Sequence, residues 1–470
     1  MRVVMKFGGT SVGSIQALQQ VINILTKARQ QENHEVVVVV SAMSGVTDRL
    51  LTAAHRAEAG DEDVAHEARV EIEEKHANAS LQFLGDTPTR NELMSQITAL
   101  LNEFEALCHG IHVLGELTPR ALDVIGGLGE RMNAPQVAAV LTNAGIAAQA
   151  VDATELIVTD NRFGSSVPLI DETAQKSQTR LQPLLAQSIV PVVTGYIGAT
   201  LDGIPTTLGR GGSDYSATII GRALAADEVW IWTDVNGVMT TDPRIVPEAH
   251  PIAHLSYAEI SELSYFGAKV LHSQAIRPAR RVGMPVRILN TFEPDHPGTL
   301  ITGDAQDGNK TVKAVSAIKN MSLVTVAGPG MVGIPGVAGR TFTAVARTDT
   351  SVMMISQASS EQAICFVVPT QDVGRVIRSV ETEMIREIER RDLDRIRSED
   401  NTVVLAVVGS GMKGTPGVSG RLFGALGRNK INVIAIAQGS SEFNISLVIA
   451  QGDAERAVQV IHKEFELEKP

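Results

Sequence analysis

The sequence predicts an α/β protein in which a helix-covered sheet is followed by two small βαββαβ units. Over residues 1–300, strand-like and helix-like segments alternate, as expected of a sheet with helices on its faces. Examples of the strand-like segments are Glu35–Val40, Ile189–Thr194 and Glu228–Trp232. Further on, Gly328–Val368 aligns without gaps on Gly409–Ile449, and 20 of the 41 aligned positions are identical. A repeat of this length indicates two copies of one supersecondary unit.

The two patterns also predict the domain boundaries. We expect a first domain over residues 1–300, one repeat unit over 312–390 and another over 401–470. The connection is predicted at Glu293–Gly308, which is rich in proline, glycine and charge. The second copy ends without its last strand, so the apolar segment 312–319 is expected to supply it. A charge-rich helical segment, residues 61–106, is expected to form a subdomain that covers the functional site.

Composition and charge exclude several classes of protein. With 53 acidic and 41 basic residues the net charge is -12, which disfavours nucleic acid and anionic membranes as partners. No apolar run is long enough to cross a bilayer, and residues 1–9 lack the pattern of a secretory signal. Cys108 and Cys365 have apolar neighbours and no metal-ligand spacing, so a reducing, cytoplasmic location is expected. A nucleotide remains an allowed ligand, because local loops rather than net charge hold phosphates.

A glycine-rich segment, Thr206–Ser216, is the first candidate binding loop. Its three glycines would let the backbone come within hydrogen-bonding distance of a phosphate. Arg210 offers a planar fork for carboxylate or phosphate oxygens. Ser213, Asp214 and Ser216 are predicted to cap the helix that continues through the apolar run Ala217–Ala226. Taken alone, the segment would equally suit an ordinary glycine turn.

A second candidate loop lies near the start of the chain. The strand-like run Val3–Phe7 leads into the segment Lys6–Ser11, which contains two glycines and two hydroxyl residues, and a helical pattern follows over Ser14–Arg29. Lys6 would neutralise phosphate charge, and the amides of the turn would donate hydrogen bonds. No GxxxxGK[ST] occurs in the chain, so this is not a Walker A loop. A β-turn with a solvated lysine is the alternative for this segment by itself.

Each repeat contains a GxGxxG pattern, at Gly328–Gly333 and at Gly409–Gly414. The pattern occurs in dinucleotide sites when it joins a strand to a helix. In both copies, however, two adjacent strands are predicted after the helix, which is not the βαβαβ order of such a site. We therefore reject a dinucleotide site in the repeats.

Together these segments resemble the aspartate kinases. Five further motifs follow in the family's order: Ser41–Asp48, Gly129–Arg131, Trp232–Val235, Thr241–Arg244 and Glu262–His272. The resemblance covers essentially all 470 residues, and the repeats look like paired ACT domains, which bind amino acids as regulators. It implies an amino-acid-kinase-type αβα sandwich followed by two ferredoxin-like ACT units. It also implies ATP-dependent phosphorylation of the side-chain carboxylate of L-aspartate, the first step toward lysine, threonine and methionine, with Mg²⁺ as Mg-ATP.

The resemblance implies four residues around aspartate: Thr47, Glu130, Arg210 and Ser213. Glu130 would hold the ammonium and Arg210 the α-carboxylate. Lys6 would contact the transferring phosphate, and Asp214 would either orient Lys6 or bind the ammonium. Lys6, Arg210 and Asp214 are thus the catalytic candidates, and a carboxylate nucleophile, already ionised at pH 7, needs no general base. Without the resemblance, Glu130 and Arg131 would be interpreted as a solvated helical pair.

The residues implied on the ATP side are Lys6, Gly8, Gly9, Ser11, Thr233, Asp234, Met239, Arg244, Lys269 and Val270. Asp234 would hold ribose hydroxyls, or else serve as a turn residue before Gly237. Met239 stands where family members usually have tyrosine; a thioether can pack on adenine but lacks the hydrogen bond of a phenol. Gly127 stands where the family has serine ahead of Gly-Glu.

The implied contacts to a regulatory effector are Gln357, Gln438, Met331, Val352, Asn432 and Asn444. Both repeats carry Gln-x-Ser-Ser-Glu, and a glutamine there favours threonine over lysine as the effector. The second copy has two asparagines where the first has Ser351 and Ala363, so the copies are expected to differ in ligand binding. A polar strand end with a solvated glutamine is the alternative. Pairing of ACT units predicts a homodimer, with a tetramer as the larger alternative.

Two other functions stay open. Another amino-acid kinase, such as acetylglutamate kinase or glutamate 5-kinase, would share the glycine loops and a lysine. An inactive kinase kept as an amino-acid sensor belongs to a different class, and the intact Lys6, Glu130, Arg210, Asp214 and Lys269 argue against it. The sequence ends directly after the second repeat, so a monofunctional enzyme without a homoserine dehydrogenase domain is expected.

Overall fold

The computed structural model describes residues 1–61, 63–267, 271–303, 310–331, 335–357, 362–440 and 442–469. Contacts between Cα atoms divide the chain into two compact units. Unit 1 comprises residues 1–238, 253–257 and 270–304, and unit 2 comprises 239–252, 258–269 and 305–470. Two segments of the predicted first domain, 239–252 and 258–269, thus belong to unit 2. The reason is their bonding: the carbonyl of Thr240 accepts the N–H of Val315 at 2.8 Å, and Glu259 accepts the N–H of Ser410 at 2.7 Å.

Unit 1 is built on an eight-stranded sheet. Its strands are β1 (Arg2–Phe7), β2 (Glu35–Val40), β3 (Ala148–Val151), β5 (Val190–Thr194), β8 (Glu228–Thr233), β9 (His254–Ser256), β10 (Val286–Asn290) and β11 (Thr299–Thr302). They lie in the order β3-β5-β2-β1-β8-β10-β11-β9, and each neighbouring pair is parallel except β10–β11. A smaller sheet joins β4 (Val158–Thr159), β6 (Ile197–Thr200) and β7 (Pro205–Thr207).

One sequence expectation is wrong here. β11 lies within the segment predicted as a connection, Glu293–Gly308. Ile301 of this strand is fully buried and pairs with Val286 of β10, so burial against the sheet outweighs the local proline and glycine signals.

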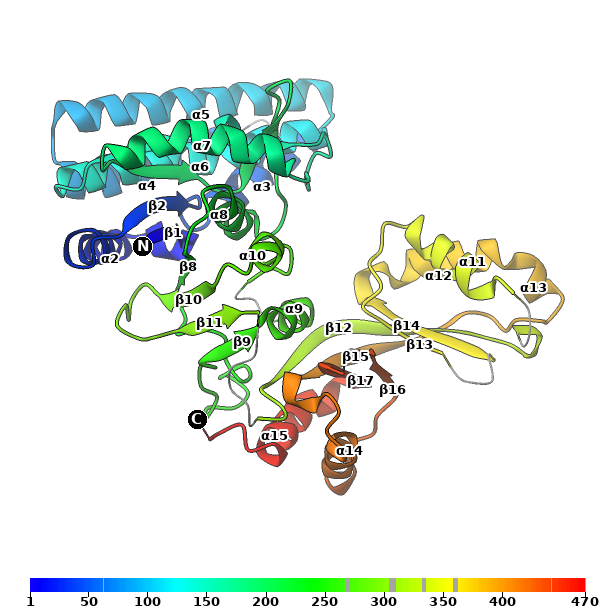
Figure 1. The fold of residues 1–470 in the computed structure, drawn as a ribbon. Coiled ribbons are helices and arrows are strands. Elements are labelled where there is room, and N and C mark those ends of the chain that lie inside the picture. Colours follow the sequence, from blue (N-terminus) through cyan, green and yellow to red (C-terminus); the bar gives the residue numbers. More distant parts are fainter. Residues whose placement is uncertain are drawn as a thin grey trace. The chain divides into compact units, whose positions relative to one another are not determined.

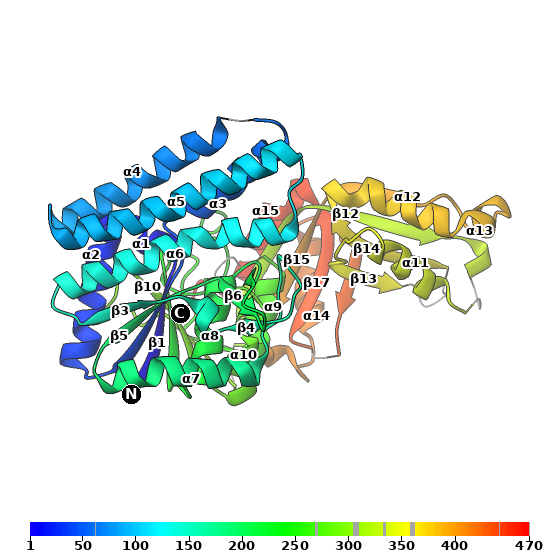
Figure 2. The same ribbon diagram turned by 90° about the horizontal axis from the view of Figure 1, so that it is seen from above.

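Helices cover both faces of the large sheet, which makes unit 1 the predicted αβα sandwich. They are α1 (Gly9–Val12), α2 (Ile15–Thr26), α3 (Val46–Glu58), α4 (Val64–Leu84), α5 (Pro88–Leu114), α6 (Pro119–Asn143), α7 (Ile170–Ala186), α8 (Gly212–Ala223) and α10 (Arg277–Val282). Val3, Met5 and Phe7 of β1 join one buried cluster with α2–α6, whereas α8 packs on β1, β2 and β8 from outside that cluster. Figure 2 shows the sheet between α6 and α7, with α4 and α5 alongside α6 (Figure 1, Figure 2).

Helix starts follow local chemistry in some places and tertiary packing in others. The predicted helix after the first loop forms as α2, and the Ser14 hydroxyl caps it by accepting the N–H of Ala17 at 3.1 Å. At α8 the predicted caps, Ser213, Asp214 and Ser216, instead lie inside the helix. The capping position belongs to Gly211 at φ +71°, a left-handed conformation that glycine adopts without strain.

Unit 2 contains the repeats, and each forms the predicted order of strand, helix, two strands and helix. The first copy has β12 (Ala314–Ala327), α11 (Val337–Ala346), β13 (Met354–Gln357), β14 (Ala363–Pro369) and α12 (Val373–Glu383), followed by α13 (Ile385–Glu389). The second has β15 (Arg397–Val408), α14 (Val418–Arg428), β16 (Ala435–Gln438), β17 (Asn444–Ala450) and α15 (Ala454–Glu464). Most of α9 (Tyr257–Tyr265) also belongs to this unit.

The two copies share one six-stranded sheet, in the order β13-β14-β12-β15-β17-β16. The long strand β12 serves both: its Met321–Ala327 part pairs with β14, and its Ala314–Ile318 part pairs with the Val404–Val408 part of β15. A register break at Ile318–Met321 separates the two parts. The first residues of β12 therefore supply the strand that the second copy lacks in its own sequence, as predicted for residues 312–319 (Figure 1).

The first two glycines of each GxGxxG pattern have a packing role. A Cβ on Gly411 would lie 2.6 Å from the carbonyl oxygen of Lys310, and one on Gly330 would lie 2.8 Å from Cα of Asp392. The segment before β12 thus packs on the turn of the second copy, and the segment before β15 packs on the turn of the first. A side chain at either position would collide with backbone.

We predict that Gly411→Ala destabilises unit 2 by about 1–3 kcal/mol, because the overlap is with backbone that cannot move aside. Gly420→Ala is the matched control. That glycine lies in α14, and no neighbouring atom comes within 4 Å of the position that a Cβ would take, so alanine should add about 0.5–1 kcal/mol of helix stability. Urea unfolding followed by circular dichroism measures both. Equal stability of the two variants would show that the close approach is not needed.

Candidate active site

The predicted binding residues of unit 1 gather at one edge of the large sheet. Lys6 lies near the carboxyl end of β1, Ser41 follows β2, Gly195 follows β5 and Thr233 ends β8. These four strands are neighbours and parallel. In open α/β sheets, ligands bind at the carboxyl ends of the strands, so this edge is the candidate active site.

A buried ion pair joins the two predicted loops. Lys6 Nζ lies 2.6 Å from Asp214 Oδ1, and each side chain is only 12% exposed. The pair connects β1 to the first turn of α8, a helix end that carries a partial positive charge from its aligned peptide dipoles. A fixed cation beside a helix N-terminus is suited to stabilising a transferring phosphoryl group.

The first loop is held tightly by its neighbours. A Cβ on Gly9 would lie 3.0 Å from the carbonyl oxygen of Ala42, and the N–H of Gly8 donates to the carbonyl of Trp232 at 3.2 Å. The Ser11 hydroxyl is buried; it donates to the same carbonyl at 3.3 Å and accepts from Thr291 Oγ1 at 2.7 Å. Ser11 thus bonds within the protein, while Lys6 supplies the charge of this loop.

The second loop presents Arg210 to solvent between two glycines. Gly209 and Gly211 have φ of +74° and +71°, and a Cβ on Gly211 would lie 2.4 Å from Cβ of His272. Burial and the nearby charge of Arg210 lower the pKa of His272. Ser213, the next predicted contact, packs against the strand end: its Oγ lies 2.7 Å from the position of a Cβ on Gly195.

Glu130 is a buried carboxyl facing this edge. Burial raises its pKa from the ordinary 4.5 to about 8, against the lowering effects of a hydrogen bond from the Ala42 backbone and of the Lys6 charge. Its Oε2 atom has no hydrogen-bond partner among the described residues. Thr47 lies close by, with Oγ1 3.6 Å from the position of a Cβ on Gly129. A buried carboxyl with an unpartnered oxygen is suited to receiving a ligand cation, whose charge would favour its ionised form.

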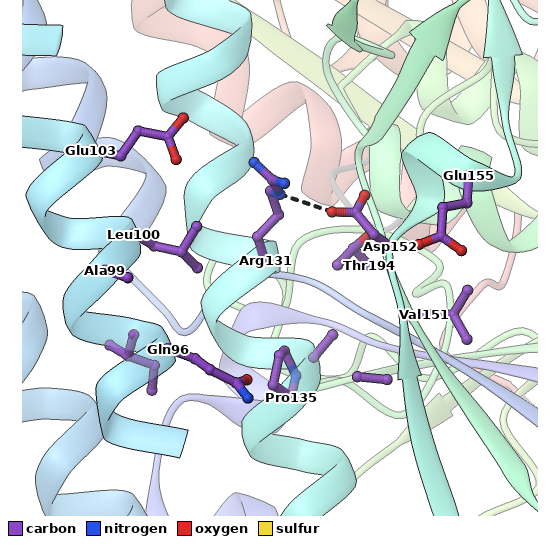
Figure 3. A pocket seen from close by; sticks show the side chains of 13 residues that line it. Gln96, Ala99, Leu100, Glu103, Arg131, Pro135, Val151, Asp152, Glu155 and Thr194 are labelled. Carbon is purple, nitrogen blue, oxygen red and sulfur yellow. Dashed lines mark hydrogen bonds and ion pairs between the residues drawn. The ribbon is translucent and has the colours of Figure 1, made fainter. Parts of the chain in front are cut away.

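The glutamate and its neighbour Arg131 do not form a solvated pair. Arg131 points to the other side of α6, where its Nε donates to Asp152 Oδ2 at 2.8 Å. It lines a cavity of about 480 Å³ between α5, α6 and the end of β3, together with Glu103, Pro135 and Asp152 (Figure 3). None of the predicted site residues lines this cavity, so it is separate from the candidate active site.

Two residues of the site were not found from the sequence. Tyr196 has φ +70°, and its ring lies 2.6 Å from the position of a Cβ on Gly212. Burial and the nearby Glu130 charge raise its pKa. Asp123 is buried and accepts hydrogen bonds from Thr207 Oγ1 at 2.6 Å and from the N–H of Gly164 at 2.9 Å. The run Gly195–Gly198, a tyrosine between glycines, was the available signal for Tyr196.

The remaining predicted nucleotide contacts fall into three groups. Thr233 and Asp234 are in unit 1, where the Thr233 hydroxyl donates to Asp234 at 3.2 Å and the aspartate is exposed. Met239 and Arg244 are in unit 2, where exposed Arg244 pairs with Asp242 at 2.6 Å and holds the pKa of that carboxyl below its usual value. Lys269 and Val270 lie outside the described residues.

The predicted effector contacts all lie in unit 2. Gln357 and Gln438 are the exposed last residues of β13 and β16, two strands that contact each other. The remaining four are Met331, which is buried, Val352, which is partly buried, Asn432, which is exposed, and Asn444. Asn444 Nδ2 is already engaged, donating to Glu262 at 3.1 Å and to Ser446 at 3.0 Å.

Two further observations concern metals and membranes. Among the described residues, no group of three or more histidine, cysteine, aspartate or glutamate side chains is arranged to hold a metal ion. Over the same part of the chain, we find no helix with the length and apolar character that crossing a membrane requires.

Comparison with known proteins extends this picture. A model of the amino acid kinase family matches residues 1–290, and a model of the ACT domain matches residues 324–384 and 405–465. A bifunctional aspartokinase/homoserine dehydrogenase of Arabidopsis thaliana is 37% identical over 471 residues, covering 99% of this chain and 51% of the relative. The chain thus spans about half the length of these bifunctional relatives. Aspartokinase 2 of the same plant is 32% identical over 473 residues, covering 98% of this chain and 84% of the relative.

Solved structures agree with the sequence matches. Aspartokinase III of E. coli in complex with aspartate and ADP superposes with a TM-score of 0.83 at 29% identity and 99% coverage of both chains. The same enzyme in complex with lysine and aspartate gives a TM-score of 0.78 at 30% identity, covering 98% of this chain and 99% of the other.

The raised pKa of Glu130 predicts a pH-dependent stability. Between pH 4.5 and about 8 the folded state holds a proton that the unfolded chain has lost, so this carboxyl contributes less stability as pH rises through that window. Glu130→Gln should therefore be more stable than the wild type at pH 8 and near equal to it at pH 4.5. The difference is bounded by about 1.4 kcal/mol per pH unit. Urea unfolding across this pH range measures the difference in the free energy of unfolding. Glu103→Gln, which removes an exposed carboxylate, is the control. If the free energy of unfolding of Glu130→Gln changed with pH in parallel with that of the wild type, the burial argument would be contradicted.

Proposed function

This chain belongs to the aspartokinases of the amino acid kinase family, and we propose that it transfers the γ-phosphoryl group of ATP to the side-chain carboxylate of L-aspartate. The product would be 4-phospho-L-aspartate, the first intermediate toward lysine, threonine and methionine. The observation that carries the proposal is the convergence of the Lys6–Asp214 pair and buried Glu130 at one sheet edge.

The proposed chemistry needs little beyond positioning and charge. An aspartate carboxylate is ionised at neutral pH, so it attacks the γ-phosphorus without a general base. Lys6 stabilises the charge on the transferring group, and Asp214, 2.6 Å from its Nζ, holds that ammonium in place. The N-terminal N–H groups of α8 add a partial positive charge to the same region.

Recognition of aspartate is proposed to divide between two charged groups. Glu130 would bind the substrate ammonium through its unpartnered Oε2, and this new charge would return its pKa toward the ordinary value. Exposed Arg210 would hold the α-carboxylate as a bidentate fork. Thr47 and Ser213 would complete the contacts.

The nucleotide is proposed to lie over the first loop and the end of β8. Gly8, Gly9 and Lys6 would face its phosphates, and Thr233 and Asp234 its ribose. Five further contacts to the nucleotide remain predictions: Ser11, Met239, Arg244, Lys269 and Val270. Mg²⁺ would arrive with ATP as part of the substrate.

A regulatory role is proposed for the ACT units. Amino-acid binding near Gln357 and Gln438 would favour a less active arrangement, limited by the difference in effector affinity between the two states. Threonine is the favoured effector because both repeats end the edge strand on glutamine. Lysine is the second candidate, since E. coli aspartokinase III has been solved with lysine. A homodimer through the ACT units is part of the same proposal.

The proposal is tested by the initial rate of ADP formation from Mg-ATP with and without L-aspartate, glutamate and acetylglutamate. We expect release that depends on aspartate. Release with another acceptor alone would assign a different amino-acid kinase. Amino-acid binding to folded protein without any ADP release would instead support a sensor.

Removing the ammonium group of Lys6 should slow the chemical step. We predict that Lys6→Ala lowers kcat by roughly 10²–10³-fold, the usual effect of losing one preorganised electrostatic group. Asp214→Asn should lower kcat by a smaller factor, because the lysine stays but loses its anchor. The matched control is Lys27→Ala, which removes an exposed lysine paired with Asp295 at 2.9 Å. Equal kcat in Lys6→Ala and Lys27→Ala would remove Lys6 from the reaction.

A separate variant tests the proposed effector site. We predict that Gln438→Ala raises the threonine concentration that halves the rate by roughly five- to tenfold, the loss of about one hydrogen bond. Gln451→Ala, an exposed glutamine of the same repeat outside β16, is the control. Rates over a threonine and a lysine series decide the effector; inhibition unchanged in Gln438→Ala would place the effector elsewhere.

A further inference from the structure

The segment that joins β2 to α3 carries part of the candidate active site and is clamped from two sides. On one side, the N–H of Ser44 donates to the carbonyl of Gly9 at 3.2 Å. On the other, α6 approaches so closely that a Cβ on Gly129 would lie 2.6 Å from Cβ of Ala42. This segment, residues 41–47, includes the first two residues of α3 and ends at Thr47. Its position therefore sets where the proposed aspartate contacts lie.

Polar side chains of α6 reach this segment at three-residue intervals. The backbone of Ala42 lies close enough to the Glu130 carboxyl to lower its pKa. One turn on, Asn133 Nδ2 donates to the carbonyl of Ser41 at 2.6 Å. After a further turn, Gln136 Nε2 lies 3.6 Å from the sulfur of Met43. Residues spaced by three share one side of a helix, so three successive residues of the segment each have a partner on α6.

A fourth side chain, that of His76, orients Gln136. His76 of α4 places Nδ1 2.9 Å from Gln136 Oε1. Burial lowers the pKa of His76 to about 4, so the ring is neutral at neutral pH. A neutral ring facing a carbonyl oxygen must carry its proton on Nδ1, and the amide NH₂ of Gln136 is thereby directed at Met43.

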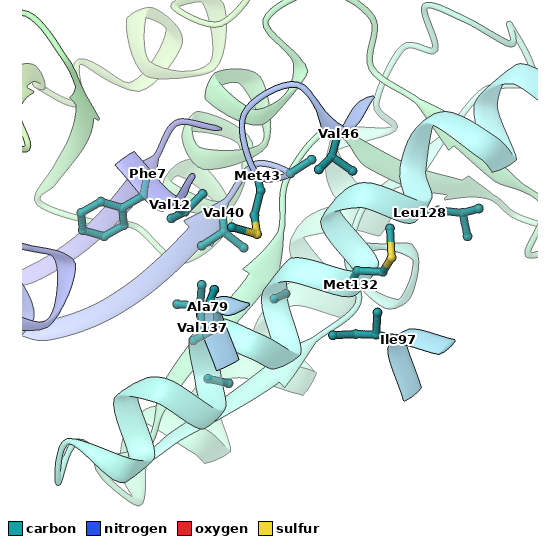
Figure 4. Close-up of a cluster of buried hydrophobic side chains, with 14 of the residues drawn as sticks. Phe7, Val12, Val40, Met43, Val46, Ala79, Ile97, Leu128, Met132 and Val137 are labelled. Atoms are coloured by element: carbon teal, nitrogen blue, oxygen red, sulfur yellow. The ribbon is translucent and has the colours of Figure 1, made fainter. Parts of the chain in front are cut away.

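These polar groups stand in an otherwise apolar environment. His76, Asn133 and Gln136 are fully buried, beside a cluster that includes Met43, Met132 and Val137 (Figure 4). Within the described part of the chain, His76 Nε2 and Asn133 Oδ1 have no hydrogen-bond partner. Buried polar atoms without partners cost stability, and apolar side chains of the same size would avoid that cost. Their presence calls for a role other than stability.

We propose that Asn133, Gln136 and His76 are positioning residues that hold residues 41–47 in register with Glu130. The inference rests on the proposed function, because it assigns the segment to aspartate binding. The three residues do not touch substrate. They act through the Ser41 carbonyl and the Met43 side chain, which keep the Ala42 N–H near Glu130 and hold Thr47 in the first turn of α3.

The kinetic test compares two asparagines of the same helix. Asn133→Leu removes the donor to Ser41 and keeps the side-chain size. Asn143→Leu is the control, because Asn143 also lies in α6 and also donates to a backbone carbonyl, that of Phe83 at 2.9 Å. We expect Asn133→Leu to raise KM for aspartate by about tenfold, with KM for ATP changed less than about twofold. The control should leave both constants within about twofold of wild type.

A merely structural role predicts a different result. Loss of stability alone would lower the melting temperature without changing KM for aspartate in the folded fraction. Unchanged KM in Asn133→Leu, or equal changes in the two leucine variants, would therefore overturn the proposal. Asn133→Ser, which keeps a shorter donor, should restore part of the affinity.

A second measurement does not depend on turnover. In protein labelled with ¹³C at the methionine methyl groups, the Met43 signal is assigned from its loss in Met43→Leu. We expect this signal to shift in both Gln136→Leu and His76→Phe, because both variants release the amide from the sulfur. An unmoved Met43 signal in both would overturn the proposal. If wild type shows no aspartate-dependent ADP release while the signal shifts, the proposed substrate fails and the positioning of the segment stands.

Discussion

The contact between Lys6 and Asp214 is the constraint on which the candidate site depends. It joins the central strand of an eight-stranded sheet to the first turn of α8, two elements that are distant from each other in the chain. Both groups are largely removed from water, where their mutual attraction is much stronger than at the surface. A lysine held in this way keeps its charge at the sheet edge before any substrate arrives. Catalysis by preorganised charge requires such an arrangement.

Close approach of backbone shapes the rest of this edge. Ala42 packs directly on Gly129, and Ser213 packs directly on Gly195. A Cβ at either glycine would lie within 2.7 Å of that neighbouring side chain. Neither glycine is needed for flexibility, because neither adopts a positive φ. They are needed because two elements come closer than any side chain allows. The polar side chains of α6 then act on a segment already within reach, which is why Asn133 can bond the Ser41 carbonyl directly.

In unit 2 the same principle explains a sequence pattern that suggests nucleotide binding. The first two glycines of each GxGxxG lie against a backbone segment that precedes the long strand of the other copy. Because β12 and β15 each contribute to both halves of the sheet, neither copy has a complete set of strands from its own sequence. The repeats therefore form one compact unit with a shared sheet in the structure, although they are two units in sequence.

Local patterns in the sequence were enough to determine the alternating architecture, the repeat and the two loops that contain Lys6 and Arg210. These features depend on residues close together in the chain, such as the apolar run of β1 or the cap of α2 at Ser14. Tertiary structure alone decided the chemical state of the site. The pKa of Glu130 comes from burial under segments distant in sequence, and the φ of +70° at Tyr196 is maintained by packing against Gly212. The start of α8 at Gly211 and the strand at Ile301 were likewise decided by packing. The physical reason is that burial, electrostatic environment and close backbone approach arise only when separate segments meet. Periodicity and capping, by contrast, depend on residues that are close together in the chain.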